Sequence, residues 1–370
     1  MIIGIDVSML VYRGSGVANY TYNLVKNLLI SDKNNEYRLF YSSLRRPKNF
    51  YYLDEFKRLG ARVYSYPFPP RVLELWWSRW HIIPVEWFIG KVDWYFSSDF
   101  LRPPLMKGTK GITTIHDLTW KVFPQFHTQK IVKAHHRKID LTIKYGDLII
   151  TDSQNTKKDL LKYYPETAKK NKIEVIYPGV DSRFRQIKDQ SEIANVLKKY
   201  NILYPKRYLL YVGAIEPRKN IITAIKIFAK LIKDCKYKDF EFLIVGRAGW
   251  KNEQIFQYIS NNNLKDKIKF TGFVEDEDLP YFYNACVANI YLSKYEGFGL
   301  PPVEAAACGR ATLMYANSSL KELKINDCTK KGEELSSLIK IISENHNHIR
   351  MPDKFNWVKV VSQFVALFNA

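Results

Sequence analysis

Short apolar runs alternate with amphipathic stretches along the first half of the chain, and this alternation predicts its secondary structure. A strand is expected over Ile2–Val7, and a helix from about Ala18 to Leu29 follows the Gly14-Ser15-Gly16 loop. Strand–helix alternation is typical of a parallel sheet that is covered by helices on both faces. The further strands expected in this half are residues 37–41, 62–66, 94–97, 111–115 and 148–151.

The same pattern restarts in the second half. Tyr208–Val212 reads as a buried strand that ends at Gly213, and strands are also expected over Phe242–Val245 and Ala288–Leu292. Apolar residues at 221, 224, 225, 228, 229 and 232 form one helical stripe after the first of these strands. Two successive sets of βα units predict two Rossmann-like α/β domains.

A ligand bound between two such domains would meet the carboxyl ends of both sheets, where open α/β sheets bind ligands. We therefore expect two domains that face a central cleft. Residues 1–185 are assigned to the N-terminal domain and residues 186–354 to the C-terminal domain, with the boundary in the polar stretch from about Asp181 to Lys206.

Composition agrees with a globular protein of two domains. The chain has 370 residues, of which 46% are hydrophobic and 25% charged, and this excludes a disordered chain. No apolar run is long enough to span a bilayer, and the first residues resemble a strand rather than a signal peptide. Cys235, Cys286, Cys308 and Cys328 lack the spacing of metal ligands. A cytoplasmic location is expected, with contact at the inner face of the membrane left open.

The formal net charge of +20 favours anionic partners. Nucleic acid, a membrane surface and phosphorylated substrates all meet that description, and net charge does not choose among them.

The stretch Glu296–Glu304 carries the most specific chemical signal. It follows the expected strand Ala288–Leu292 and leads into an apolar helical segment with Pro301 or Pro302 at its first position. Gly297 and Gly299 would let the backbone turn tightly and approach a ligand. The free N–H groups of the first helical turn would attract an anion such as a pyrophosphate.

The two glutamates of this stretch suit different parts of a nucleotide-linked ligand. Glu304, placed in the first helical turn, is expected to accept hydrogen bonds from a ribose diol. Glu296, on the strand side, is expected to bind hydroxyls beyond the far phosphate. The alternative is that Glu304 complements the helix dipole and that Glu296 is solvated.

Two further turns follow strand ends. Arg218 and Lys219 lie in the turn after Gly213, where they could neutralise a leaving pyrophosphate without a metal, unless they are merely solvated. His116 follows the expected strand 111–115 and would point into the cleft, with a structural histidine supported by Asp117 as the alternative.

Together these segments resemble the retaining family-four glycosyltransferases of the GT-B fold, whose two glutamates have the spacing of Glu296 and Glu304. The turn Glu216–Asn220, the element His116–Pro124 and the final Phe355-Asn356-Trp357 are similar to the family as well. The resemblance implies that Glu304 holds the donor ribose and that Glu296 contacts the transferred sugar. It also implies that residues 355–370 form a helix crossing back to the first domain, that anomeric configuration is retained, and that no metal or other cofactor is needed.

The resemblance adds donor contacts in two loops. Gly16 would face the substrates, and Phe273 and Val274 would contact the nucleotide base through the backbone. Glu296, His116, Arg218 and Lys219 are the expected catalytic residues. The expected donor-binding residues are Gly16, Arg218, Lys219, Phe273, Val274, Glu296, Gly297, Phe298, Gly299, Leu300 and Glu304.

Two other features have competing interpretations. Asp276-Glu277-Asp278 matches the metal-binding Asp-x-Asp pattern of the GT-A fold, but its place before an apolar helical segment favours a helix cap. Trp76, Trp77, Trp80 and Trp87 lie on a basic aromatic segment that either packs on the first domain or contacts a membrane interface.

The expected function is hexosyl transfer from a nucleotide diphosphate sugar to a glycan or lipid-linked saccharide in cell-surface polysaccharide synthesis, including lipopolysaccharide O-antigen. Resemblance to bacterial mannosyltransferases favours GDP-mannose as donor, with a UDP-hexose second. The alternatives are a GT-B epimerase or phosphorylase, and a basic membrane- or nucleic-acid-binding protein with an inactive site. No interleaved aromatic RNA-binding signature is visible, so no nucleic-acid partner is expected.

Overall fold

The computed structural model describes residues 1–44, 50–99, 101–247, 249, 252–344 and 349–369. The chain divides into two compact units. Unit 1 comprises Met1–Gly179 and Lys354–Ala370, and unit 2 comprises Val180–Asp353. The sequence had placed the domain boundaries at residues 185–186 and 354–355.

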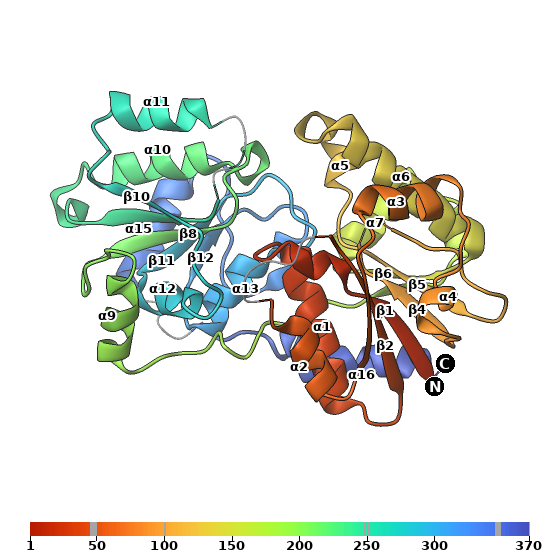
Figure 1. Ribbon diagram of the computed structural model, residues 1–370. Coiled ribbons are helices and arrows are strands. Elements are labelled where there is room, and N and C mark those ends of the chain that lie inside the picture. The colour runs from red at the N-terminus through yellow and green to blue at the C-terminus, as the bar shows by residue number, and fades with distance from the viewer. Residues whose placement is uncertain (45–49, 100, 248, 250–251, 345–348, 370) are drawn as a thin grey trace. The chain divides into compact units, whose positions relative to one another are not determined.

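Unit 1 contains a seven-stranded parallel sheet with the order β3-β2-β1-β4-β5-β6-β7 (Figure 1). Its strands are β1 (Ile2–Asp6), β2 (Glu36–Ser42), β3 (Arg62–Tyr66), β4 (Trp94–Ser97), β5 (Lys110–Ile115), β6 (Leu148–Thr151) and β7 (Ile173–Val175). Its helices are η1 (Ser8–Val11), α1 (Gly16–Ser31), α2 (Tyr52–Arg58), α3 (Pro70–Leu73), η2 (Glu74–Arg79), α4 (Glu86–Ile89), α5 (Thr119–Val122), η3 (Pro124–Phe126), α6 (Gln129–Tyr145), α7 (Gln154–Tyr163), α8 (Thr167–Lys170) and α16 (Trp357–Phe368).

Unit 2 contains a five-stranded parallel sheet with the order β10-β9-β8-β11-β12. Its strands are β8 (Tyr208–Val212), β9 (Glu241–Val245), β10 (Ile268–Gly272), β11 (Ala288–Tyr291) and β12 (Thr312–Met314). Its helices are α9 (Gln190–Lys198), η4 (Pro217–Lys219), α10 (Ile221–Leu231), η5 (Cys235–Tyr237), α11 (Glu253–Asn261), α12 (Leu279–Ala285), α13 (Leu300–Ala307), α14 (Leu320–Leu323) and α15 (Glu334–Ser343). A further short turn, η6, spans Asp353–Phe355.

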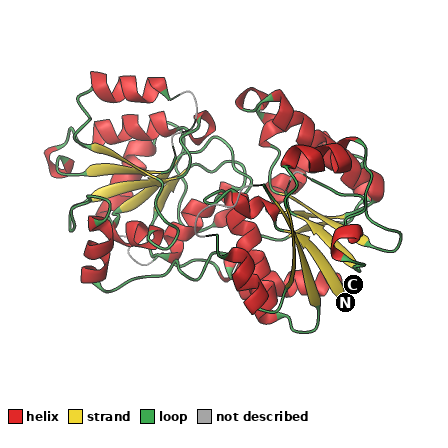
Figure 2. Ribbon diagram, in the orientation of Figure 1, coloured by secondary structure: helices red, strands yellow, loops and turns green. Residues whose placement is uncertain are grey.

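Helices flank the strands of each unit (Figure 2), as parallel sheets require, because a strand in such a sheet is buried on both faces. Every residue of β8 and of β9 is buried. The predicted strands are confirmed to within a residue or two of their ends. Three strands were not predicted: β10, and the three-residue strands β7 and β12.

Helix α16 packs on unit 1, where it lies beside α1 (Figure 1). Its buried face is Trp357, Val360, Val361, Phe364 and Phe368, the spacing of one helical stripe. The ring of Phe364 meets that of Phe96 at 5.8 Å, and Trp94 Nε1 donates to the Phe368 carbonyl at 3.1 Å. The last segment of the chain is therefore part of the core of the first unit.

The tryptophan-rich segment of unit 1 has a buried side and an exposed side. Trp77 is fully buried and Trp76 packs against the same apolar cluster. Trp80 and Trp87 are 55% and 71% exposed. Neither sequence-based interpretation therefore covers all four side chains. Among the described residues, no helix is long and apolar enough to cross a bilayer.

Candidate active site

The candidate site of unit 2 lies at the carboxyl ends of two neighbouring strands. Strand β8 leads into the turn that contains Arg218 and Lys219, and β11 leads into the loop that contains Glu296. Because β8 pairs with β11 in parallel, both segments leave the same edge of the sheet. Adjacency in the sheet therefore brings together two motifs that are far apart in the sequence.

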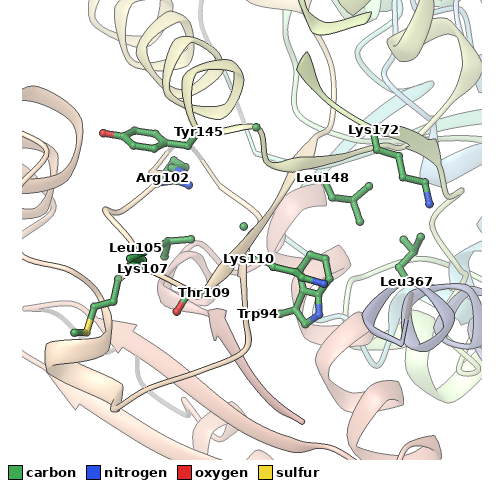
Figure 3. Close-up of a pocket in the computed structure, with 14 residues that line it drawn as sticks. Trp94, Arg102, Leu105, Lys107, Thr109, Lys110, Tyr145, Leu148, Lys172 and Leu367 are labelled. Carbon is green, nitrogen blue, oxygen red and sulfur yellow. The ribbon is translucent and has the colours of Figure 1, made fainter. Parts of the chain in front are cut away.

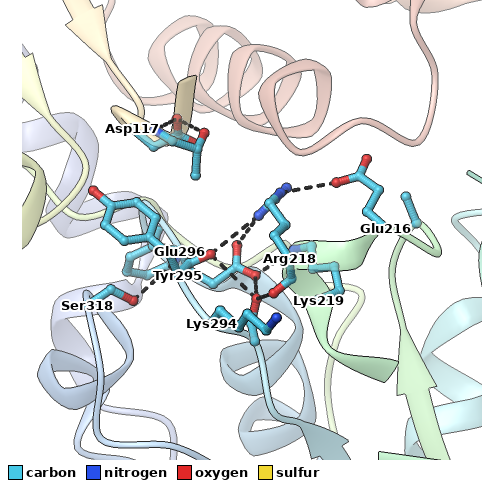
Figure 4. Close-up of polar contacts among 12 residues, drawn as sticks. Asp117, Glu216, Arg218, Lys219, Lys294, Tyr295, Glu296 and Ser318 are labelled. Carbon is cyan, nitrogen blue, oxygen red and sulfur yellow. Dashed lines mark hydrogen bonds and ion pairs between the residues drawn. The ribbon is translucent and has the colours of Figure 1, made fainter. Parts of the chain in front are cut away.

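Glu296 is the centre of this arrangement (Figure 4). Its side chain is buried, and Oε1 accepts from Lys219 Nζ at 2.7 Å and from the Tyr291 hydroxyl at 2.9 Å. Oε1 also accepts from the Ser293 hydroxyl, and Oε2 accepts from Arg218 Nη1 at 3.1 Å. The alternative of a solvated glutamate is therefore wrong.

These contacts keep Glu296 ionised. Burial raises the pKa of its carboxyl group, but the charges of Lys219 and Arg218 outweigh burial and lower the pKa to about 2. Lys219 is itself buried and donates to the Tyr291 hydroxyl at 2.6 Å. Arg218 Nε also pairs with Glu216 at 3.1 Å. The two cations thus face two carboxylates.

Hydrogen bonds to its backbone hold the Glu296 loop in place. The Ser318 hydroxyl accepts from the Glu296 N–H at 3.0 Å. The Ser319 hydroxyl donates to the carbonyls of Glu296 at 2.9 Å and Phe298 at 2.8 Å. The Lys294 N–H donates to the Arg218 carbonyl at 2.9 Å, which ties this loop to the basic turn.

The glycine turn leads into helix α13. Gly299 has a φ of 103°, and a Cβ placed on it would lie 2.6 Å from Leu320 Cδ2. The backbone conformation therefore favours glycine at this position, and a larger residue would also have to displace the end of the Leu320 side chain. Gly297, by contrast, does not adopt a positive φ. Helix α13 begins at Leu300, so Pro301 occupies its second position rather than its first.

Glu304 lies one turn further along than the sequence suggested. It is the fifth residue of α13, and the first turn of this helix contains no acidic residue. The expectation of a first-turn glutamate, and with it the simple dipole role, is wrong because the helix starts before the prolines. Its side chain is buried, and Oε2 accepts from the Tyr283 hydroxyl at 2.8 Å.

The environment of Glu304 has the opposite effect to that of Glu296. Burial raises the pKa of Glu304 to about 7, although the hydrogen bond from Tyr283 lowers it, and the negative charges of Asp276 and Asp181 add to the rise. One motif thus holds one carboxylate that is firmly ionised and another that titrates near neutrality.

The expected base-contacting loop follows β10. Val274 is buried among the apolar residues of unit 2, and the Arg247 guanidinium lies 5.1 Å from the centroid of the Phe273 ring. The assignment of both residues to donor binding stays a prediction.

The acidic stretch 276–278 precedes α12 as expected, and Asp278 occupies the N-cap position. Its side chain makes no cap hydrogen bond, however. It accepts from the Tyr200 hydroxyl at 2.9 Å and pairs with Lys199 at 3.2 Å. Among the described residues, no group of three or more His, Cys, Asp or Glu side chains is placed to hold a metal ion.

His116 belongs to unit 1, at the carboxyl end of β5. Its Nδ1 contacts Asp152 Oδ2 at 2.7 Å, and its Nε2 contacts the Ser98 carbonyl at 2.8 Å. A carbonyl oxygen only accepts, so Nε2 carries a proton, and Nδ1 donates to the Asp152 carboxylate when the ring is protonated. Burial lowers the pKa of His116, but Asp152 outweighs it and raises the pKa. Both ring nitrogens are engaged within unit 1, and Asp152, not Asp117, supports the ring.

The basic helix next to His116 contributes a buried cation. Lys138 of α6 donates to the Thr114 carbonyl at 2.6 Å, and burial lowers its pKa to about 8.

Gly16 begins α1, whose N-cap residue Ser15 accepts from the Ala18 N–H at 3.2 Å. The substrate contacts expected of Gly16 and His116 stay predictions.

Sequence reasoning missed several residues of these networks. Asp152 directly follows strand β6, so the rule that selected His116 at the end of β5 could have selected it too. Tyr291 and Ser293 lie five and three residues before Glu296. Ser318 and Ser319 carry no motif signal, because their contacts to the loop depend on the tertiary fold.

Comparison with known proteins gives a consistent family. A model described as "Glycosyl transferases group 1" matches residues 192–340, and one described as "Glycosyltransferase Family 4" matches residues 14–184. O-antigen chain mannosyltransferase B of Escherichia coli is 25% identical over 326 residues, which are 84% of this chain and 81% of that protein. O-antigen chain mannosyltransferase RfbU of Salmonella typhimurium is 26% identical over 335 residues, covering 85% and 87% of the two chains.

Solved structures agree on the fold. Anabaena HepE in complex with UDP and glucose has a TM-score of 0.71 at 16% identity, covering 100% of this chain and 99% of that chain. Sucrose-phosphate synthase from Thermosynechococcus elongatus has a TM-score of 0.73 at 16% identity, covering 100% and 98%. With its two parallel α/β sheets and its two matched domains, the chain belongs to the group 1, family-four glycosyltransferases of the GT-B fold.

Proposed function

We propose that this glycosyltransferase moves a hexose from a nucleotide diphosphate sugar to a glycan or lipid-linked saccharide in cell-surface polysaccharide synthesis. The observation that carries the proposal is the cluster of Glu296, Arg218 and Lys219 beside the N-terminus of α13. Cations and a helix N-terminus at one strand edge suit a diphosphate. The mannosyltransferase relatives favour mannose, and GDP-mannose is the first donor candidate, with a UDP-hexose second.

The mechanism follows from the charge of the cluster. Arg218 and Lys219 are paired with Glu296 and Glu216, so their charge is balanced before a donor arrives. An incoming diphosphate would compete for the two cations, which would then stabilise the leaving group without a metal. Glu304 would accept from the ribose hydroxyls. His116 would orient the transferred sugar by exchanging the Ser98 carbonyl at its Nε2 for a sugar hydroxyl.

Retention is proposed to proceed by front-face attack rather than through a covalent intermediate. Glu296 is a poor nucleophile, because one of its carboxylate oxygens accepts from three donors and the other faces Arg218. The leaving diphosphate would assist the acceptor hydroxyl instead. An inverted anomeric centre in the first product, measured by NMR, would contradict this.

Membrane contact is proposed for the exposed aromatic residues of unit 1. Trp80, Ile82 and Trp87 are 55%, 44% and 71% exposed, and the exposed Arg71 and Arg79 lie in the same segment. Apolar rings beside cations suit the interface of an anionic membrane. The protein would then work at the cytoplasmic face of the membrane, where lipid-linked acceptors are accessible.

A nucleotide screen tests the function. We expect a nucleoside diphosphate, with GDP first, and its sugar to raise the melting temperature of the protein, because a ligand that binds only the folded state stabilises it by about 2.7 kcal/mol at one hundred times its Kd. Differential scanning fluorimetry with UDP, GDP, ADP and their sugars identifies the base. If none of them shifts the melting temperature, the proposed function is wrong.

Removal of the Arg218 side chain tests the proposed diphosphate site. Arg218→Ala should lower kcat by about 10²–10³-fold, the usual cost of losing a group that stabilises developing negative charge. Lys226→Ala, which removes an exposed lysine from helix α10, is the control and should retain full activity. Circular dichroism checks that both variants are folded. Full activity of folded Arg218→Ala would refute the assignment.

The raised pKa of Glu304 predicts a pH dependence of nucleotide binding. The ionised carboxylate accepts hydrogen bonds from both ribose hydroxyls, so affinity should rise as the pH increases through about 7. Glu304→Gln should weaken binding and remove this rise, as measured by calorimetric titration. A wild-type affinity that is independent of pH between 6 and 8 would contradict the ribose role.

The same substitution should stabilise the fold at high pH. Because the folded-state pKa of Glu304 lies above its ordinary value of 4.5, the protonated form favours folding, and this stability is lost as the pH rises through about 7. The melting temperature of Glu304→Gln should therefore exceed that of the wild type at pH 8 and approach it at pH 5.

Vesicle binding tests the membrane proposal. The double variant Trp80→Ala, Trp87→Ala should cosediment severalfold less with anionic phospholipid vesicles than the wild type. The control Tyr12→Ala, Leu203→Ala removes two other apolar side chains that are 51% and 70% exposed. Equal binding by the wild type and both variants would place membrane contact elsewhere or exclude it.

A further inference from the structure

A cavity of about 600 Å³ lies in unit 1 at the amino ends of three neighbouring strands (Figure 3). Trp94, Lys110 and Leu148, the first residues of β4, β5 and β6, line it. His116 follows the opposite end of β5, so within unit 1 the cavity and His116 lie at opposite ends of the strands. Its volume is within the range of small-molecule pockets.

The cavity lining is cationic. Among the described residues, four cationic side chains and no carboxylate line it: Arg102, Lys107, Lys110 and Lys172. Lys107 and Lys110 form no ion pair with a described carboxylate, and Lys110 Nζ lies 4.8 Å from the centroid of the Trp94 ring. Lys172 lies 3.3 Å from Glu174. The positive charge of the lining is therefore only partly balanced.

Arg102 is fixed at the wall of the cavity. Its side chain is 4% exposed and binds Asp147 through Nε at 3.0 Å and through Nη2 at 2.6 Å, while Nη1 donates to the Pro103 carbonyl at 2.8 Å. Asp147 also accepts from the Thr113 hydroxyl at 2.8 Å. A guanidinium carries five N–H groups, so two remain without a described partner in a rigid, preorganised orientation.

A glycine allows this arrangement. A Cβ on Gly111 would lie 2.2 Å from Asp147 Oδ1, so any larger residue would push away the carboxylate that orients Arg102. Burying an ion pair is costly unless its geometry is good and its remaining groups are bound. The fold thus places a buried, oriented arginine beside two unpaired lysines.

The rest of the lining is largely apolar. Leu105, Leu148 and Leu367 contribute aliphatic surface. Met106 and Tyr145, which also line the cavity, are 38% and 46% exposed. A bare anion would leave this surface without a contact, whereas an organic anion would cover it.

We propose that this cavity is a second binding site, specific for an organic phosphate ester. The phosphate would contact Lys107, Lys110 and the free N–H groups of Arg102, and the organic part would lie against the leucines. A soluble phosphate ester and the headgroup of an anionic phospholipid share this chemistry. The site is independent of sugar transfer, because it uses none of the donor-site residues of unit 2.

Two probes that carry the same phosphate group distinguish a soluble phosphate ester from a phospholipid headgroup. Glycerol 3-phosphate and dihexanoyl phosphatidic acid, the latter below its micellar concentration, are titrated calorimetrically into the full chain without nucleotide. Binding of both indicates a soluble phosphate ester, and binding of the lipid alone indicates a headgroup. The triple variant Lys107→Gln, Lys110→Gln, Lys172→Gln should weaken the binding at least about tenfold, because charge-assisted hydrogen bonds are lost.

A charge-matched control separates the cavity from the overall positive charge. Lys133→Gln, Lys158→Gln, Lys169→Gln removes three exposed lysines of unit 1 that do not line the cavity. It should bind both probes as the wild type does. The proposal is overturned if neither probe binds at millimolar concentration, or if the two triple variants bind equally. The nucleotide screen does not depend on either result.

Discussion

A carboxylate buried in the second unit must be compensated, and this requirement organises the candidate active site. Removal of an ion from water costs several kcal/mol unless charges and hydrogen bonds replace the water. Glu296 meets the requirement with a lysine and an arginine from the turn after β8 and with hydroxyl groups from its own strand and loop. The basic turn and the glutamate loop are consequently held in a single arrangement.

The two glutamates show how environment divides the chemistry of one short motif. Cations around Glu296 lower its pKa to about 2, whereas burial raises the pKa of Glu304 to about 7 despite the hydrogen bond from Tyr283. A carboxylate that orients cations must stay charged. A carboxylate that receives a neutral diol can remain partly protonated until the ligand arrives. At high pH the buried Glu304 carboxylate is ionised, and this lowers the stability of the protein without ligand. Residues that are needed for binding often lower the folding stability of a protein in this way.

Much of this architecture could be predicted from the sequence. Buried parallel strands are continuous apolar runs, so β8 and β9 were visible as such, and strand ends pointed to Arg218, Lys219 and His116. Strands of three residues, such as β7 and β12, are too short to show a period. The serine contacts to the Glu296 loop were also invisible, because Ser318 and Ser319 reach it only through the fold. The start of α13 was misplaced because the prolines suggested a first position that Leu300 occupies.

The proposed mechanism requires that the paired cations beside Glu296 receive the diphosphate of the donor. A crystal structure with the nucleoside diphosphate that binds best tests this claim directly. We expect phosphate oxygens within hydrogen-bond distance of the Arg218 guanidinium and of Lys219 Nζ, and ribose hydroxyls that donate to Glu304. A diphosphate bound away from these side chains, with the ion pairs of Glu296 unchanged, would contradict it.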